Sequence, residues 1–171
     1  DLARLILLSG LPGSGKSTLA HRMSHLTGAI LLRIDVFEQD LRNANGASFD
    51  VGTQGYQIGY DLARHHLLEG KDVIADAVNA VEPARAGWRI VAEETGTQII
   101  EIEIVCTNED EVARRLRTRE TGISGLPPVR LQDRHERIWE PSPLSSGTVD
   151  TAGRPIADCV DDLFRLVKQT R

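Results

Sequence analysis

The sequence predicts a single α/β domain of three layers, in which five short strands form a mostly parallel sheet with helices on both faces. Three observations lead to this fold. Short apolar runs alternate along the chain with amphipathic stretches that are long enough to serve as crossover helices. A glycine-rich stretch joins the first apolar run to the first helical pattern. The chain has 171 residues, 40% of them apolar, which suits one domain with a sizeable core.

Five stretches have the pattern of strands. The first is apolar without alternation, as in a strand that is buried on both faces. The fourth alternates isoleucines with Glu101 and Glu103, which we expect to be exposed. The strands are predicted at residues 4–9, 29–34, 72–77, 98–105 and 148–150. If the sheet is parallel, their carboxyl ends lie on one edge, which is where ligands bind to such sheets.

The stretches between the strands carry the start and stop signals of helices. Gly28 and Gly96 each end a helical pattern, Pro83 lies in a first turn, and Asn108 is placed to cap the following helix. In the last helix we expect Ile156 and other apolar residues to point inward. The helices are predicted at residues 16–26, 36–41, from within 43–60 to 70, 82–96, 109–119, 129–139 and 156–169.

The glycine-rich stretch fits the phosphate-binding template G-x-x-x-x-G-K-[ST]. Its glycines let successive backbone N–H groups point at one anion, and the next helix directs the positive end of its dipole there. Lys16 is expected to bind the β- and γ-phosphates of a triphosphate, and the Ser17 hydroxyl to bind Mg²⁺. The predicted nucleotide-binding residues here are Gly10, Pro12, Gly13, Ser14, Gly15, Lys16, Ser17 and Thr18. The alternative is a glycine-rich turn without a ligand.

Acidic residues lie at the ends of three predicted strands, on the edge that carries this loop: Asp35, Asp76 and Asp150. Asp76 has the form of the acid that helps to hold Mg²⁺, although a strand-end turn residue is the structural alternative. Asp35 is the predicted catalytic base, which accepts the proton of an acceptor hydroxyl or orients a water. Its structural alternative is an N-cap of the helix predicted at 36–41.

Seven arginines lie between residues 114 and 137. Arginines that close over a site stabilise the charge of a transferring phosphoryl group and exclude water. We therefore predict a lid at about residues 115–135, with Arg115 and Arg119, one helical turn apart, as its catalytic arginines. The other arginines are expected to form solvated helix faces. Beyond the last strand, Gly153 and Arg154 are predicted to lie beside the nucleotide base.

The acceptor-binding region is predicted at about residues 36–66, where amides, hydroxyls and glycines are frequent. Because no lysine or arginine lies between Arg42 and Arg64, this wall favours a small neutral molecule such as a sugar, polyol, nucleoside or antibiotic. A polynucleotide would require cations here to neutralise its phosphates. The formal charge of −5 also argues against a nucleic-acid partner.

Other features of the composition concern the location of the protein. The apolar run at residues 5–8 is too short for a signal peptide or a membrane span. Cys106 and Cys159 share no metal-ligand spacing and imply no disulfide framework. We therefore expect a cytoplasmic protein that does not contact membranes, of unspecified oligomeric state. The chain begins with Asp1 rather than Met, from which we expect that a short leader or tag has been lost.

Taken together, these residues resemble the P-loop small-molecule kinases, whose members include gluconate kinase, chloramphenicol phosphotransferase, the zeta toxins and the kinase domain of polynucleotide kinase. The resemblance is carried by residues 10–20, Asp35, residues 73–79 with Arg85, and Glu111-Val112 before Arg115 and Arg119. It implies a P-loop NTPase fold of nucleoside- and nucleotide-kinase type with a helical lid. It also implies ATP and Mg²⁺ as cofactors, transfer of the γ-phosphoryl group to a hydroxyl, and Asp35 as the activating base.

The sequence departs from relatives that phosphorylate nucleic acid, which tend to have an arginine about one turn after the strand-end acid, where this chain has Glu38. A polynucleotide or nucleotide kinase remains an alternative. A regulatory NTPase is another, because residues 150–153 imitate the D-x-x-G motif of GTPases, although they follow the last strand and no N-K-x-D is present. The third alternative is a nucleotide-binding module without chemistry, which would tolerate the loss of Asp35.

Overall fold

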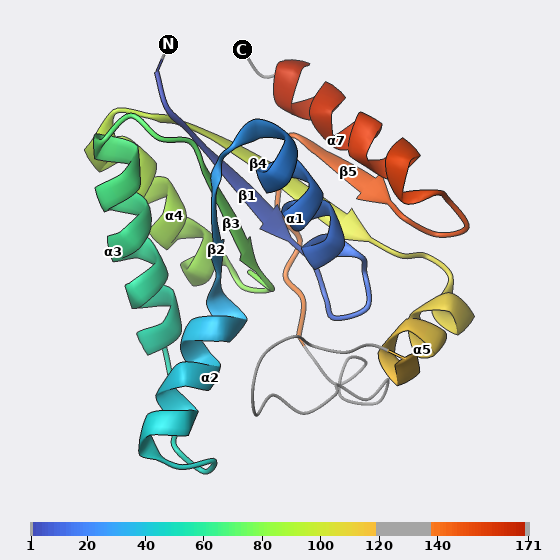
Figure 1. Cartoon of the computed structure of the whole chain (residues 1–171), viewed down its shortest axis with the longest axis horizontal. Helices are drawn as coiled ribbons and strands as arrows, with labels where there is room; N and C mark the ends of the chain where they lie inside the picture. The colour runs from blue at the N-terminus through green and yellow to red at the C-terminus, as the bar shows by residue number, and fades with distance from the viewer. Residues whose placement is uncertain (1, 119–137, 170–171) are drawn as a thin grey trace.

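The computed structural model describes residues 2–118 and 138–169 (Figure 1). Its sheet consists of β1 (Arg4–Ser9), β2 (Ile30–Arg33), β3 (Val73–Ala77), β4 (Gln98–Val105) and β5 (Gly147–Asp150). The spatial order is β2-β3-β1-β4-β5, and every neighbouring pair is parallel. The predicted α/β class with five strands is confirmed, and the sheet is parallel throughout.

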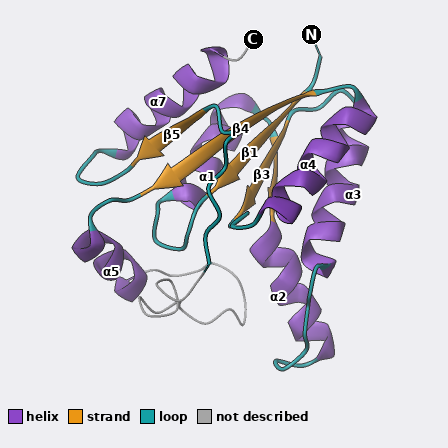
Figure 2. Cartoon of the chain, turned by 180° about the vertical axis from the view of Figure 1, so that it is seen from behind, coloured by secondary structure: helices purple, strands orange, loops and turns teal. Residues whose placement is uncertain are grey.

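Helices cover both faces of this sheet (Figures 1 and 2). They are α1 (Lys16–Thr27), α2 (Ile34–Asn45), α3 (Gln54–Leu68), α4 (Glu82–Thr95), α5 (Glu109–Thr118) and α7 (Ile156–Gln169). Ile6 and Leu8 of β1 pack in one core cluster with residues of α1 and α7, whereas Leu5 and Leu7 pack in another with residues of α3 and α4. Because successive side chains of a strand face opposite sides, β1 needs apolar residues at each of positions 5–8.

Helix α2 is longer than the predicted 36–41 and begins directly after β2. No glycine or proline lies in this stretch before Gly46, whose N–H closes the helix on the carbonyl oxygen of Arg42. Asp35 therefore lies in the first turn of α2, not at the end of a strand. A carboxylate is stabilised there by the positive end of the helix dipole.

Two predicted orientations are wrong. Glu101 is only 7% exposed, because Arg89 donates hydrogen bonds of 2.9 Å to both of its carboxylate oxygens. Ile156 is 44% exposed, because as the first residue of α7 it lies at the rim of the cavity described below. The predicted lid and the predicted helix at 129–139 lie largely outside the described residues, and residues 138 and 139 are not helical.

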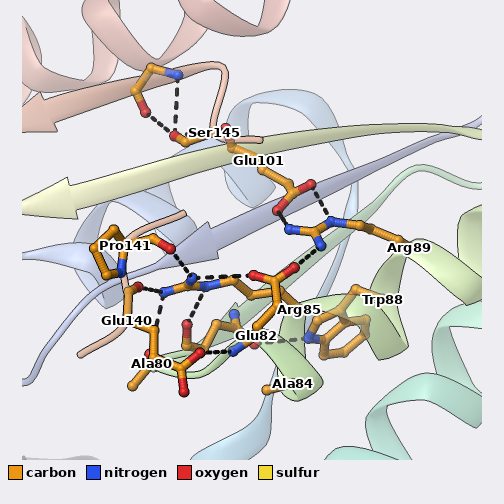
Figure 3. Close-up of polar contacts among 12 residues, drawn as sticks. Ala80, Glu82, Ala84, Arg85, Trp88, Arg89, Glu101, Glu140, Pro141 and Ser145 are labelled. Atoms are coloured by element: carbon orange, nitrogen blue, oxygen red, sulfur yellow. Dashed lines mark hydrogen bonds and ion pairs between the residues drawn. The ribbon is translucent and has the colours of Figure 1, made fainter. Parts of the chain in front are cut away.

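A buried polar cluster fixes the loop after β3 (Figure 3). Asn79 has the positive φ of 50°, and its Oδ1 accepts a hydrogen bond of 2.9 Å from Trp88 Nε1. Arg85 is 1% exposed and donates to the carbonyl oxygens of Asn79 at 2.8 Å and of Glu140 at 2.5 Å. Tyr56 Oη accepts the N–H of Asn79 at 3.1 Å. The cluster thus joins α4, residue 140 and α3 at the carboxyl edge of the sheet.

Within the described residues, none of the helices combines the length and the apolar character that a membrane span requires.

Candidate active site

A cavity of about 780 Å³ opens at the carboxyl edge of the sheet, which is a volume typical of small-molecule sites. Segments far apart in the sequence surround it. Its lining consists of residues 10–19, His21, Arg33, Ile34, Asp35, Glu38, Arg42, Tyr56, Val78, Glu111, Arg115, Thr151, Arg154, Ile156 and Cys159. The fold thus places the glycine-rich loop and Asp35 in one cavity.

The glycine-rich loop has the backbone that the template requires. Gly13 and Gly15 have φ values of 83° and 93°, which side chains other than glycine rarely allow. A Cβ atom on Gly10 would lie 2.5 Å from the carbonyl oxygen of Ile104, so the loop can pass the end of β4 only as glycine. The N–H of Gly10 donates to the carbonyl oxygen of Val78 at 3.2 Å. The loop therefore has the tight backbone turns of the phosphate-binding template directly before helix α1.

Two cations and a hydroxyl surround Asp76. The Lys16 ammonium donates to Oδ1 of Asp76, and Ser17 Oγ donates to Oδ2 at 3.0 Å. Arg33 Nε lies 3.5 Å from Oδ2. Burial acts to raise the pKa of Asp76, but Lys16, Arg33 and Ser17 outweigh it and lower this pKa below its ordinary value of 3.8. Asp76 is therefore an ionised carboxylate in a cluster with one excess positive charge.

This cluster should make the fold less stable in acid. The folded pKa of Asp76 is below the unfolded value, so its contribution to stability is present above pH 3.8 and is lost as pH falls through the folded pKa. We expect the urea midpoint of the wild type to fall below about pH 4 more steeply than that of Asp76→Asn, which has no carboxyl at this position. Equal slopes for the two proteins between pH 5 and the acid limit would contradict the expectation.

The oxygen atoms of Ser17 and Asp76 fit the preference of Mg²⁺ for hard oxygen ligands. Ser17 directly follows the loop that would hold the phosphates. Asp76 lies on β3, which is the neighbour of β1, the strand that leads into this loop. Ser17 and Asp76, the residues predicted to hold Mg²⁺, thus have the kind of donor atom that this ion prefers.

Arg115 lies on the opposite side of the loop from Asp76. Its Nη1 donates to the carbonyl oxygen of Gly13 at 3.1 Å and to Thr151 Oγ1 at 2.9 Å, and its Nη2 donates to Glu111 at 2.6 Å. Thr151 Oγ1 in turn donates to the carbonyl oxygen of Ser14 at 2.6 Å. Arg115 therefore supports the backbone of the loop while lining the cavity. Arg119, the other predicted lid arginine, lies outside the described residues.

The turn after β5 lines the cavity on the same side as α7. The N–H of Gly153 donates to Glu111 Oε2 at 2.8 Å. The guanidinium of Arg154 donates to the carbonyl oxygen of Asp150 at 3.1 Å and pairs with Asp162 at 2.7 Å. Arg154 lines the cavity and Gly153 does not, although the sequence predicts both beside the nucleotide base. Asp150 itself bonds Thr107 and the N–H of Ala152, which is a structural role.

The opposite wall of the cavity comes from α2 and α3. Within the predicted acceptor region the lining residues are Glu38, Arg42 and Tyr56. Glu38 and Arg42 follow Asp35 by three and seven residues, so all three lie on one face of α2. The premise of a wall without cations is therefore wrong, since Arg42 and Arg33 both line the cavity. The asparagines and glutamines of this region do not line it.

Two residues of this site, Arg33 and Thr151, are not predicted from the sequence. Arg33 ends a strand that is otherwise apolar, and a charged residue at the end of a buried run is a signal that could identify it. Thr151 is 5% exposed and donates a hydrogen bond to the glycine-rich loop, whereas in the sequence it is only one residue of the stretch that imitates D-x-x-G. Both act through contacts with residues distant in the chain.

A parallel sheet with a glycine-rich loop between its central strand β1 and helix α1 defines a P-loop nucleotide-binding protein. Residues 5–135 match the family AAA_33, described as AAA domain. The chain belongs to this family. The resemblance to P-loop small-molecule kinases is thereby confirmed.

Individual relatives agree with this assignment. A protein of Aeropyrum pernix named "Probable adenylyl-sulfate kinase" is 29% identical over 178 residues, which cover 96% of this chain and 92% of that protein. An uncharacterised protein of Mycobacterium bovis is 32% identical over 133 residues, but the match spans only 26% of its length. That relative is therefore a much longer protein.

Solved structures show the same fold. A gluconokinase from Sinorhizobium meliloti superposes with a TM-score of 0.68 at 18% identity, covering 99% of this chain and 95% of that one. A sugar kinase from a Janibacter species superposes with a TM-score of 0.69 at 16% identity, covering 98% of this chain and 95% of that one. The sheet and helices described above are thus those of known kinases.

Proposed function

We propose that the protein is an ATP-dependent phosphotransferase that acts on an alcohol group of a small molecule. The observation that carries the proposal is the shared cavity, in which Asp35 faces the same space as Lys16 and the phosphate loop. A nucleotide-binding module needs the loop alone. A kinase also needs a group that accepts the proton of the acceptor hydroxyl, and a carboxylate in the first turn of α2 is such a group.

The nucleotide is held by this chain's own donors. Backbone N–H groups of the loop and the Lys16 ammonium bind its phosphates, and Arg115 keeps the loop in shape through Gly13. Bound Mg²⁺ neutralises part of the phosphate charge. Ser17 and Asp76 are the residues that would hold it. Gly153 and Arg154 are proposed to flank the base, and Arg119 to act with Arg115 on the phosphates.

The acceptor is proposed to bind between α2 and α3. Asp35 would orient the acceptor hydroxyl toward the phosphoryl group and take its proton, while Tyr56 and Glu38 offer hydrogen bonds. The sequence pointed to a neutral sugar, polyol, nucleoside or antibiotic. Because Arg33 and Arg42 also line the cavity, the proposed class includes hydroxyl compounds that carry an anionic group. The relatives also bear the names of different acceptors, gluconate and adenylyl sulfate.

We further propose that residues 1–171 act as one catalytic domain in the cytoplasm. The support is the single sheet that carries both walls of the cavity, together with two buried cysteines, Cys106 and Cys159, that are not joined in a disulfide.

A screen of ATP consumption tests the function. The protein is incubated with Mg²⁺, ATP labelled at the γ-phosphate, and panels of neutral and anionic hydroxyl compounds, including nucleosides and antibiotics. We expect transfer of label to at least one small molecule at a rate well above ATP hydrolysis without acceptor. Robust labelling of 5′-hydroxyl oligonucleotides alone would instead identify a polynucleotide kinase. ATP hydrolysis whose rate no added acceptor changes, with no transfer of label to any acceptor, would identify a regulatory NTPase.

A further inference from the structure

Arg33 is the last residue of β2, two positions before Asp35. The rest of this strand is apolar, so the strand pattern does not account for a charged residue at its end. Its side chain is 14% exposed and lines the cavity. In the sheet Arg33 pairs with Asp76 of β3, which places its guanidinium beside the cluster of Lys16 and Ser17.

The hydrogen bonds of Arg33 are incomplete. Its Nε is buried and has no hydrogen-bond partner among the described residues, although it lies 3.5 Å from Asp76 Oδ2. Asp76 already accepts from Lys16 on one oxygen and from Ser17 on the other. A buried donor without a hydrogen-bond partner is costly, and the charge of Asp76 offsets only part of that cost. The guanidinium belongs to a residue that lines the cavity, where a bound anion would contact it.

The other arginines beside the loop differ from Arg33 in this respect. Arg115 is bonded to Gly13, Thr151 and Glu111, and Arg154 is bonded to Asp150 and Asp162. The guanidiniums of both are hydrogen-bonded to other residues of the protein. The single negative charge of Asp76 is paired with the positive charges of both Arg33 and Lys16. The cluster therefore carries one excess positive charge, which faces the cavity. An anion between Lys16 and Asp35 would balance this charge.

We propose that Arg33 is a catalytic residue that donates hydrogen bonds to the transferring phosphoryl group from the acceptor side. This rests on the proposed function of the cavity. In that reaction the acceptor oxygen forms a bond to the γ-phosphorus while the bond from this phosphorus to the β,γ-bridging oxygen breaks. The hydroxyl proton passes to Asp35, and ADP is released.

The position of Arg33 suits this role. Negative charge is spread over three equatorial oxygens as the phosphoryl group moves, and a guanidinium fork can bind two of them where an ammonium binds as a point charge. Because a strand pairing and Asp76 fix Arg33, little rearrangement is needed when the charge develops. Lys16 would act from the loop and Arg33 from the end of β2.

The test compares binding of ADP with binding of ADP plus aluminium fluoride, both with Mg²⁺, by calorimetry. Aluminium fluoride stands in for the transferring phosphoryl group, so no acceptor is required. We expect Arg33→Gln to weaken the binding of ADP–aluminium fluoride roughly ten- to hundredfold while the affinity for ADP changes little. Arg33→Lys should not restore the loss, because a lysine cannot form the fork. Arg4→Gln is the matched control and should bind as the wild type, since Arg4 begins β1 at the other edge and pairs with Asp72.

Each outcome decides a different question. If the wild type shows no preference for ADP–aluminium fluoride over ADP, phosphoryl transfer is contradicted, and the role of Arg33 with it. If the wild type shows the preference and Arg33→Gln keeps it, only the Arg33 proposal fails. Rescue by Arg33→Lys, or an equal loss for both ligands, would mean that Arg33 merely neutralises Asp76. Should Arg33→Gln not fold, Arg33→Lys decides, because it keeps the charge beside Asp76: retention of the preference overturns the proposal.

Discussion

Replacement of Asp35 by asparagine should lower kcat by about two to four orders of magnitude while ATP binds as tightly as in the wild type. The amide keeps the shape of the side chain in the first turn of α2 but cannot accept the hydroxyl proton. Lys16 and the loop, which are proposed to bind the phosphates, are untouched. The measurement is transfer to the acceptor found in the screen, together with ATP affinity by calorimetry.

Asp40→Asn is a suitable control for this variant. Asp40 lies on the same helix but is exposed and does not line the cavity, so its replacement should leave both transfer and binding unchanged. If Asp35→Asn transferred phosphate at the wild-type rate, Asp35 would be only a helix-end residue. A loss of ATP affinity equal to the loss of kcat would place Asp35 in the nucleotide site instead.

Replacement of Asp76 by asparagine should lower the free energy of unfolding at pH 7 by about 3–5 kcal/mol. The carboxylate is buried between Lys16 and Arg33, and its loss leaves two nearby cations without an opposite charge. Coulomb repulsion between them then adds to the cost of keeping both out of water. Urea unfolding followed by circular dichroism measures the change.

Lys16→Met provides the contrast, because it removes a cation and leaves Asp76 paired with Arg33. We expect a smaller loss of stability than for Asp76→Asn, although nucleotide binding is severely weakened. The double variant Lys16→Met/Asp76→Asn should be more stable than Asp76→Asn alone, since one of the two unpaired cations is gone. Additive losses in this double-mutant cycle would show that the two charges do not interact.

Much of the fold follows from local sequence signals. The bounds predicted for the strands at 4–9 and 98–105 and for the helix at 156–169 are those of β1, β4 and α7. The phosphate loop was predicted because its glycines, lysine and serine lie within a single short stretch. Asn108 likewise caps α5 through a hydrogen bond of 3.0 Å to the N–H of Glu111, only three residues away.

The remaining features depend on partners that are far apart in the chain. Glu101 is buried because Arg89 of α4 reaches it. Arg33 enters the site because β2 pairs with β3 in a register that sets it opposite Asp76. Arg42 is a local exception, which lines the cavity because α2 continues past its predicted end at residue 41. No pattern within a window of the sequence contains the contacts of Glu101 and Arg33, so the charge of this wall could be predicted only in part.

The direction of the first strand and of the last helix has a consequence for larger proteins that contain this domain. β1 begins, and α7 ends, at the amino edge of the sheet, and these two element ends lie near each other there (Figures 1 and 2). The cavity opens at the opposite edge. A polypeptide that continued from either end of the described fold would therefore be attached at the edge opposite the cavity, and small molecules could still enter the cavity.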